Sequence, residues 1–162
     1  MKANVFDPDF DANEEHAGFV RIRAAVAGQA GARDLGATLH ELPPGATAHP
    51  YHFHYASEEM MVVLSGRPTL RTPEGFEELE PGEVVAHPRG PEGAHQVTNR
   101  GDEPVRFLML SEMNGPEVVV YPDTGKVLAR AEASRTNEPS EFRKVFRIAD
   151  EVDYFEGETP PQ

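Results

Sequence analysis

The sequence contains no cysteine among its 162 residues. Disulfide frameworks, thiolate nucleophiles, zinc fingers and iron–sulfur clusters are therefore excluded, because each depends on cysteine sulfur. Basic residues are also few, since 15 Lys and Arg stand against 28 Asp and Glu, giving a formal net charge of −13. That charge repels nucleic-acid phosphates and anionic lipids, so we expect neither nucleic acid nor a membrane as a partner.

Long apolar runs are missing as well. No stretch reaches the length of a membrane-spanning helix, and the acidic, irregular residues 1–18 lack the apolar segment of a secretory signal. We therefore expect a cytoplasmic protein in which residues 1–18 form an N-terminal arm on the surface. The length suits one domain, and no internal repeat is visible.

Short strand-like segments separated by turns begin at Phe19. FVRIRAAV alternates apolar and polar residues, LGATLHEL ends in Pro-Pro-Gly, and Thr-Pro-Glu-Gly at 72–75 is typical of a hairpin turn. Such segments recur roughly every 8–12 residues with no long helical pattern between them. The pattern predicts an all-β sandwich or small barrel over residues 19–125.

Two predicted strands, MMVVL and RFLML, are apolar on both faces. Strands of this kind need cover on each side, from a second sheet or from another subunit, so we expect a homodimer. Residues 126–162 are predicted to form a C-terminal extension that packs on the barrel. Within it, EFRKVFRIADEVDYF fits either a strand followed by a short helix or an arm lying over the barrel.

The segment PYHFH at residues 50–54 places two histidines one residue apart. Side chains at i and i+2 of a strand share a face, so His52 and His54 would project together. Among seven histidines such a pair could also be accidental. Glu59, however, directly precedes the apolar run MMVVL, where a carboxylate needs a partner or a cation, and His95 opens a further short strand. We predict that His52, His54, Glu59 and His95 bind one divalent transition metal, namely Fe, Mn, Ni, Cu or Zn.

Two groups of residues resemble the motifs of the cupin superfamily, over roughly residues 35–112. The first group is Gly45, His52-Phe53-His54, Glu59 and Gly66, and the second is Gly82, Pro88, Gly90, His95 and Asn99. The resemblance implies a small single-domain bacterial cupin of largely unassigned function. Its expected fold is a cupin jelly roll, also called a double-stranded β-helix, with the metal inside the barrel.

The second group departs from the family pattern in the loop before His95. Four residues, Pro91-Glu92-Gly93-Ala94, stand where the family usually has two. If His95 still reaches the metal, we expect the extra residues to bulge at the mouth of the barrel.

Other polar side chains near these motifs are assigned more simply. Tyr51, Tyr55 and His87 are candidates for contact with a substrate, although most aromatic residues in such positions only pack. Glu58 is expected to face away from Glu59. The histidines His16, His40 and His49 are expected at the surface.

Four protein ligands would leave one or two positions of an octahedral metal open to a small polar molecule, such as a hydroxy acid, a diketone or a sugar. A redox metal could direct oxygen into a bound enolate, and a Lewis-acid metal could support isomerisation or hydrolysis. The second chemistry needs a general base, which the motifs do not supply, so a dioxygenase is favoured. The alternative function is a non-catalytic sensor or storage cupin. A regulator that itself contacts DNA is disfavoured, because no DNA-binding segment precedes the barrel.

Overall fold

The structure is a computed structural model of the chain and describes residues 1–131 and 142–161. Nearly all of the regular structure in these residues is β-strand. The strands are β1 (Ala12–His16), β2 (Phe19–Ala24), β3 (Leu35–Leu42), β4 (Phe53–His54), β5 (Glu59–Ser65), β6 (Thr69–Thr72), β7 (Gly75–Glu78), β8 (Val84–His87), β9 (Gln96–Thr98), β10 (Val105–Glu112), β11 (Glu117–Tyr121), β12 (Lys126–Arg130) and β13 (Arg143–Arg147). The helices are α1 (Val26–Ala30) and the short 3-10 helices η1 (Pro91–Gly93), η2 (Pro122–Thr124) and η3 (Ile148–Asp150).

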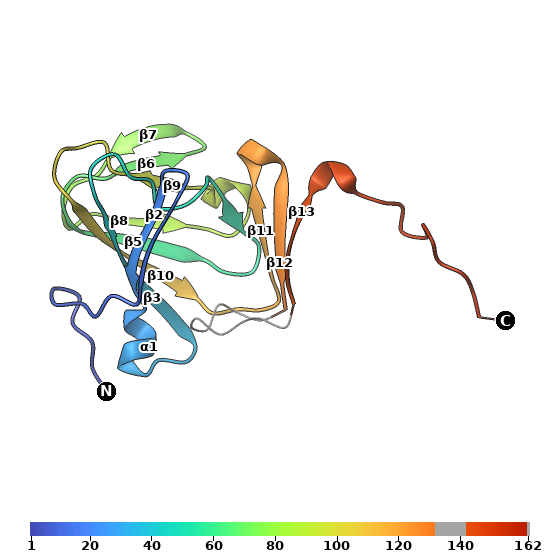
Figure 1. The fold of residues 1–162 in the computed structure, drawn as a ribbon, viewed down its shortest axis with the longest axis horizontal. Coiled ribbons are helices and arrows are strands. Elements are labelled where there is room, and N and C mark those ends of the chain that lie inside the picture. The colour runs from blue at the N-terminus through green and yellow to red at the C-terminus, as the bar shows by residue number, and fades with distance from the viewer. Residues whose placement is uncertain (132–141, 162) are drawn as a thin grey trace.

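The strands form three antiparallel sheets around a common interior (Figure 1). The largest has the order β1-β2-β3-β10-β5-β8, the second has the order β13-β12-β11-β4, and the third has the order β7-β6-β9. The predicted hairpin at 72–75 joins β6 to β7, with Thr72 opposite Gly75. This arrangement confirms the all-β jelly-roll prediction. The helix α1 was not predicted; the strand that FVRIRAAV suggested ends at Ala24, and α1 begins two residues later.

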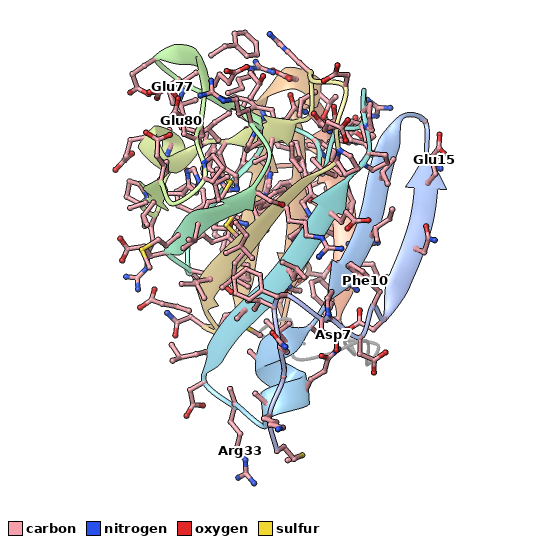
Figure 2. The ribbon with its side chains drawn as sticks, turned by 90° about the vertical axis from the view of Figure 1, so that its left-hand side faces the viewer. Asp7, Phe10, Glu15, Arg33, Glu77 and Glu80 are labelled. Atoms are coloured by element: carbon pink, nitrogen blue, oxygen red, sulfur yellow. The ribbon has the colours of Figure 1, made fainter. Side chains whose placement is uncertain are left out.

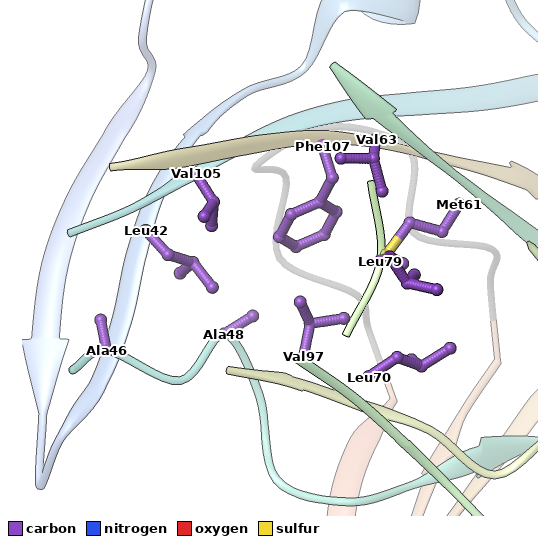
Figure 3. Close-up of a cluster of buried hydrophobic side chains, with 10 residues drawn as sticks. All are labelled: Leu42, Ala46, Ala48, Met61, Val63, Leu70, Leu79, Val97, Val105 and Phe107. Carbon is purple, nitrogen blue, oxygen red and sulfur yellow. The ribbon is translucent and has the colours of Figure 1, made fainter. Parts of the chain in front are cut away.

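One half of the interior is apolar (Figure 3). Inward side chains of β3, β5 and β10 meet those of β6 and β9, because residues paired across an antiparallel sheet point to the same side. Phe107, for example, is paired with Val63 and lies at 1% exposure. The buried residues of this cluster are Leu42, Ala46, Ala48, Met61, Val63, Leu70, Leu79, Val97, Val105 and Phe107.

Two residues of the cupin-like motifs have structural roles at this end of the barrel. The buried side-chain amide of Asn99 donates to the carbonyls of Leu42 and Glu103, and its oxygen accepts the Gly101 N–H. Gly66 has a φ of 73°, and a Cβ there would lie 2.6 Å from a side-chain carbon of Val105. Both residues therefore fix turns rather than chemistry.

The N-terminal arm is more regular than expected. Its residues 12–16 form β1, which pairs with β2 at the edge of the largest sheet (Figure 2). Phe10 of the arm packs with Leu64 and Leu108 against a buried cluster that includes Leu39. The chain's own N-terminal region thus covers part of the apolar outer face for which a second subunit was expected.

The predicted C-terminal extension begins with a strand of the second sheet. β12 pairs with β11 along its whole length, and β13 pairs with β12, so this part of the extension does lie beside the barrel. The described residues from 148 onward are exposed and run away from the barrel (Figure 1). A strand followed by the 3-10 helix η3 matches the first of the two interpretations of EFRKVFRIADEVDYF. The sequence SRTNEPS also predicts a polar break at residues 134–140, which lie outside the described residues.

Candidate metal centre

Four strand segments meet at the polar half of the interior. His54 lies on β4, Glu59 is the first residue of β5, and His95 directly precedes β9. His52 and His95 exchange backbone hydrogen bonds in an isolated antiparallel bridge, His52 N to His95 O at 3.2 Å and His95 N to His52 O at 2.9 Å. The bridge places the imidazoles of His52 and His95 side by side, with ring centroids 4.7 Å apart.

The side-chain donors converge on one carboxylate. The ligand atoms of His52, His54 and Glu59 all lie within 4.8 Å of one another. His54 Nε2 and His95 Nε2 are each 3.4 Å from Glu59 Oε2. Glu58 is exposed while Glu59 is half-buried, which agrees with the expectation that Glu58 faces away from Glu59. Among the described residues, His52, His54 and Glu59 are the group that could hold a metal ion, and His95 adjoins it through Glu59.

In His52, His54 and His95, a hydrogen bond at the ring nitrogen Nδ1 orients the imidazole. His52 Nδ1 donates to the Pro50 carbonyl at 2.8 Å, and His95 Nδ1 donates to the Gly93 carbonyl at 2.9 Å. His54 Nδ1 lies 3.3 Å from a carboxylate oxygen of Glu117. A carbonyl or carboxylate can only accept, so Nδ1 carries the proton and Nε2 keeps a lone pair for a metal. This is the arrangement that protein metal sites use to orient histidine ligands.

Glu117 is a candidate site residue that the motifs did not predict. Its side chain is fully buried at the start of β11. One oxygen faces His54, and the other accepts the N–H groups of Ala56 at 3.0 Å and Val118 at 2.9 Å. Burial opposes ionisation, but these hydrogen bonds outweigh it and lower the pKa of Glu117 to about 2. A buried anion therefore supports His54.

Burial sets the charge of the other ligands. It lowers the pKa of His52 to about 4 with help from His54, and it lowers the pKa of His95 well below the usual value. Burial raises the pKa of Glu59, although the neighbouring His54 opposes the shift. Burial also acts to lower the pKa of His54, but Glu117 and Glu59 outweigh it and the pKa is raised. His52 and His95 are thus neutral, and ready to bind a metal, at neutral pH.

His87 lies in the same interior without belonging to the ligand group. It pairs with Glu59 across β8 and β5, so the two side chains share a face. Its ring is stacked on His95 with centroids 4.0 Å apart, and its buried Nε2 has no hydrogen-bond partner among the described residues. Burial, together with the His54 charge, lowers the pKa of His87 to about 4. The result is a neutral imidazole with an unused nitrogen beside the metal ligands.

Two histidines that were expected at the surface are inside. His40 is 5% exposed and is stacked on Phe107 with centroids 4.9 Å apart, so its surface assignment was wrong. His49 is half-buried between His40 and His52, at centroid distances of 5.3 Å and 6.0 Å. His40 is inside because β3 is covered on both faces, by the barrel interior on one side and by α1 on the other. His16 is exposed, as expected.

The structure does not bring Tyr51 and Tyr55 to the ligand group. Tyr51 packs with Phe53 and Ala94 in a separate buried cluster, under the guanidinium of Arg71 at 3.9 Å. Tyr55 is 55% exposed and has its ring against Phe53. The phenol beside the histidines belongs instead to Tyr121, whose ring is stacked 6.0 Å from that of His52.

The long loop before His95 folds back on itself. η1 occupies residues 91–93, and the Gly90 N–H donates to the His54 carbonyl at 2.8 Å. Gly93 is buried so tightly that a Cβ there would lie 1.7 Å from the Pro88 carbonyl oxygen. Glu92 is exposed, so the extra residues bulge outward while His95 remains beside Glu59.

The donor set fits a divalent transition metal. Imidazole nitrogens and a carboxylate oxygen suit Fe, Mn, Ni, Cu or Zn, and three neutral imidazoles with one anion place modest charge around a dication. The Glu117–His54 hydrogen bond is the type of outer contact that metal-binding histidines usually have. His52, His54, Glu59 and His95 would hold the ion.

The fold and the site together define a class of protein. Residues 38–111 match the family model described as the cupin domain. Residues 38–111 therefore form a cupin domain, as the motifs predicted. No helix in the described residues has the length and apolar character of a membrane span. No curated protein matches the chain.

Several solved structures are similar to this chain. A protein from Acidithiobacillus ferrooxidans, provisionally named a sugar phosphate isomerase, shares 28% identity over 87% of this chain and 86% of its own, with a TM-score of 0.74. The polyketide cyclase RemF from Streptomyces resistomycificus shares 25% identity over 72% of this chain and 81% of its own, with a TM-score of 0.57. A cupin-superfamily sugar phosphate isomerase from Silicibacter pomeroyi shares the fold, at 23% identity over 93% and 94% of the two chains and a TM-score of 0.74.

Proposed function

We propose that this cupin is a metal-dependent enzyme that moves a proton at the carbon next to a carbonyl group of a small hydroxy-carbonyl substrate. The observation that carries the proposal is the unused, buried Nε2 of His87 beside four converging ligand residues. The motifs suggest ligands but no general base, and His87 of β8, beside Glu59 and His95, is our candidate for that role. The likeness to a provisionally named sugar phosphate isomerase and to a polyketide cyclase supports the same reaction class.

The residues divide into two roles. His52, His54, Glu59 and His95 would hold the metal, which when bound supplies a Lewis acid that polarises a carbonyl. His87 accepts the proton from the hydroxyl-bearing carbon next to the carbonyl and returns it to the former carbonyl carbon. The hydroxyl proton passes to the former carbonyl oxygen, so an aldose–ketose isomerisation changes no net atoms or electrons. Its low pKa keeps the imidazole neutral, and so able to accept a proton, at neutral pH.

Solvent exchange tests this function directly. The metal-loaded protein is incubated in D2O with a panel of hydroxy-ketones and aldoses, with and without a phosphate group, and deuterium incorporation is followed by proton NMR. We expect exchange at the carbon next to the carbonyl, and we expect His87→Gln to lose at least about 100-fold in rate while retaining its metal. Retained metal, measured by elemental analysis, separates loss of the base from loss of the site.

The same ligand set would also serve a dioxygenase, the function favoured by the motifs alone, and oxygen uptake distinguishes the two. Oxygen consumption with small diketones or phenols, without deuterium exchange, would replace the isomerase proposal by the dioxygenase. Tight metal binding with neither reaction across the panel would favour the non-catalytic sensor or storage protein.

A further inference from the structure

A row of paired residues crosses the second sheet from the candidate metal ligand His54, past Glu117, to two arginines. Val119 of β11 is paired with His54 of β4, and two residues earlier on the same strand Glu117 is paired with Arg130 of β12. Arg130 is in turn paired with Arg143 of β13. Paired residues, and residues two apart on a strand, share a face, so all five side chains point to the same side of the sheet.

Arg130 is a partly buried cation without a partner of its own. Its Nε–H is buried and donates to no acceptor among the described residues, and no ion pair within those residues involves its guanidinium. Glu117, which is paired with Arg130 across β11 and β12, has hydrogen bonds on both oxygens, to His54 on one and to two backbone N–H groups on the other. A half-buried guanidinium with unused donors is costly unless an anion completes it.

Arg143 adds to the electrostatic cost of the Arg130 charge, because two like charges directly opposite each other on neighbouring strands repel. Burial lowers the pKa of Arg130, and the Arg143 charge adds to this effect. Burial raises the pKa of both Glu59 and Tyr121, and the Arg130 charge opposes each shift, so the guanidinium lies within electrostatic reach of the metal ligands and of the phenol beside His52.

The rest of this face is cationic too. Lys126 is paired with Arg147, and the Lys126 ammonium lies 5.7 Å from the Tyr121 ring, which confirms that it is on the Tyr121 side. Four cations therefore share one face of β12 and β13: Lys126, Arg130, Arg143 and Arg147. In a chain of net charge −13, this concentration marks a surface that attracts anions.

We propose that Arg130 and Arg143 bind an oxyanion group of the substrate, a phosphate or a carboxylate, while its carbonyl end lies at the metal ligands. Guanidinium forks match the paired oxygens of either group. Two strand spacings and two residues along the strand separate the Cα atoms of His54 and Arg130, roughly 10–12 Å, and the long arginine side chain can reach back over part of that gap. The substrate class is thus an anionic hydroxy-carbonyl compound of a few carbons.

This inference rests on the proposed function, but its test measures anion binding, which can be absent even if the proposed reaction occurs. Binding of inorganic phosphate and of acetate to the metal-loaded protein is measured by calorimetry for the wild type, Arg130→Gln and Arg143→Gln. Lys144→Gln is the matched control, because Lys144 lies on the same strand as Arg143 but on the opposite face. Arg143 is exposed, so its substitution preserves the fold even if that of Arg130 does not.

We expect each arginine substitution to weaken phosphate or acetate binding about tenfold or more, the loss of a charged hydrogen bond, while Lys144→Gln and the metal content stay as in the wild type. The tighter-bound probe identifies the group as phosphate or carboxylate. An equal loss in Lys144→Gln would reduce the effect to general charge and overturn the proposal. Anion binding that is unchanged in both arginine variants and is lost when the metal is removed would also overturn the proposal. That result would leave the proposed metal chemistry intact.

Discussion

Replacing Glu117 by Gln isolates what the buried carboxylate contributes. The substitution keeps the size of the side chain and one oxygen for the backbone N–H groups of Ala56 and Val118, but it removes the charge beside His54 Nδ1. Removing such an outer partner of a metal-binding histidine typically weakens metal binding about 10–100-fold. We expect a loss of this size in Glu117→Gln, measured by competition with a chelator.

The same substitution has a calculable effect on stability. The fall of the Glu117 pKa from 4.5 to about 2 corresponds to a folding free energy of about 3 kcal/mol at most. Because the pKa is lower in the folded state, this stabilisation is present above pH 4.5 and is lost as the pH falls toward 2. Urea unfolding of the metal-free proteins should therefore show a difference between wild type and Glu117→Gln at pH 7 that shrinks below pH 4.

Glu58→Gln is the control for both measurements, because Glu58 is exposed and its side chain is outside the ligand group. It removes the same charge within a few residues of His54 and should leave metal affinity and stability within experimental scatter. If Glu117→Gln bound metal as tightly as the wild type and lost no stability at pH 7, the carboxylate would not orient His54, and the reasoning would fail.

Three other predictions concern the ligands, the loop and the assembly. Replacing His52 or His54 by Ala should abolish stoichiometric metal binding, and full occupancy in elemental analysis of both variants would refute the site. Gly93→Ala should weaken metal binding and lower the free energy of unfolding by about 1–3 kcal/mol. The new Cβ would lie 1.7 Å from the Pro88 carbonyl oxygen and would displace the Gly93 carbonyl that holds His95. Unchanged metal affinity in a chelator competition would show that the loop does not position His95. The chain should form a homodimer that buries exposed apolar residues of the C-terminal segment, such as Phe155, which is 73% exposed. Light scattering should then give twice the monomer mass for the wild type and a lower mass for Phe155→Ser.

The grouping of His52, His54 and Glu59 could be predicted from the sequence because their pattern is local. His52 and His54 need only the two-residue period of a strand, and Glu59 is conspicuous as a carboxylate at the head of an apolar run. Glu117 carries the same local signal, since it heads the strand EVVVY, but it was not recognised. Its partner His54 lies 63 residues away in the sequence, and only the pairing of β11 with β4 brings the two together.

The surface assignment of His40 failed for a related reason. His40 was expected at the surface because no partner for its imidazole is visible in the sequence. In the fold, Leu39 packs toward α1 while His40 points into the barrel against Phe107, so both faces are covered. Cover on the second face comes from the N-terminal region, whose position no local pattern reveals. The position of Arg130 depends in the same way on the pairing of β11 with β12.

The charge states explain how one barrel can hold so many imidazoles. A buried charged group is costly, whereas a buried neutral imidazole needs only its hydrogen bonds. Burial keeps His40, His52 and His87 neutral, with pKa values of about 3 to about 4. Only His54 has a raised pKa, and it lies between the two carboxylates of Glu59 and Glu117. The two carboxylates that favour a positive charge on His54 would favour a bound dication in the same way.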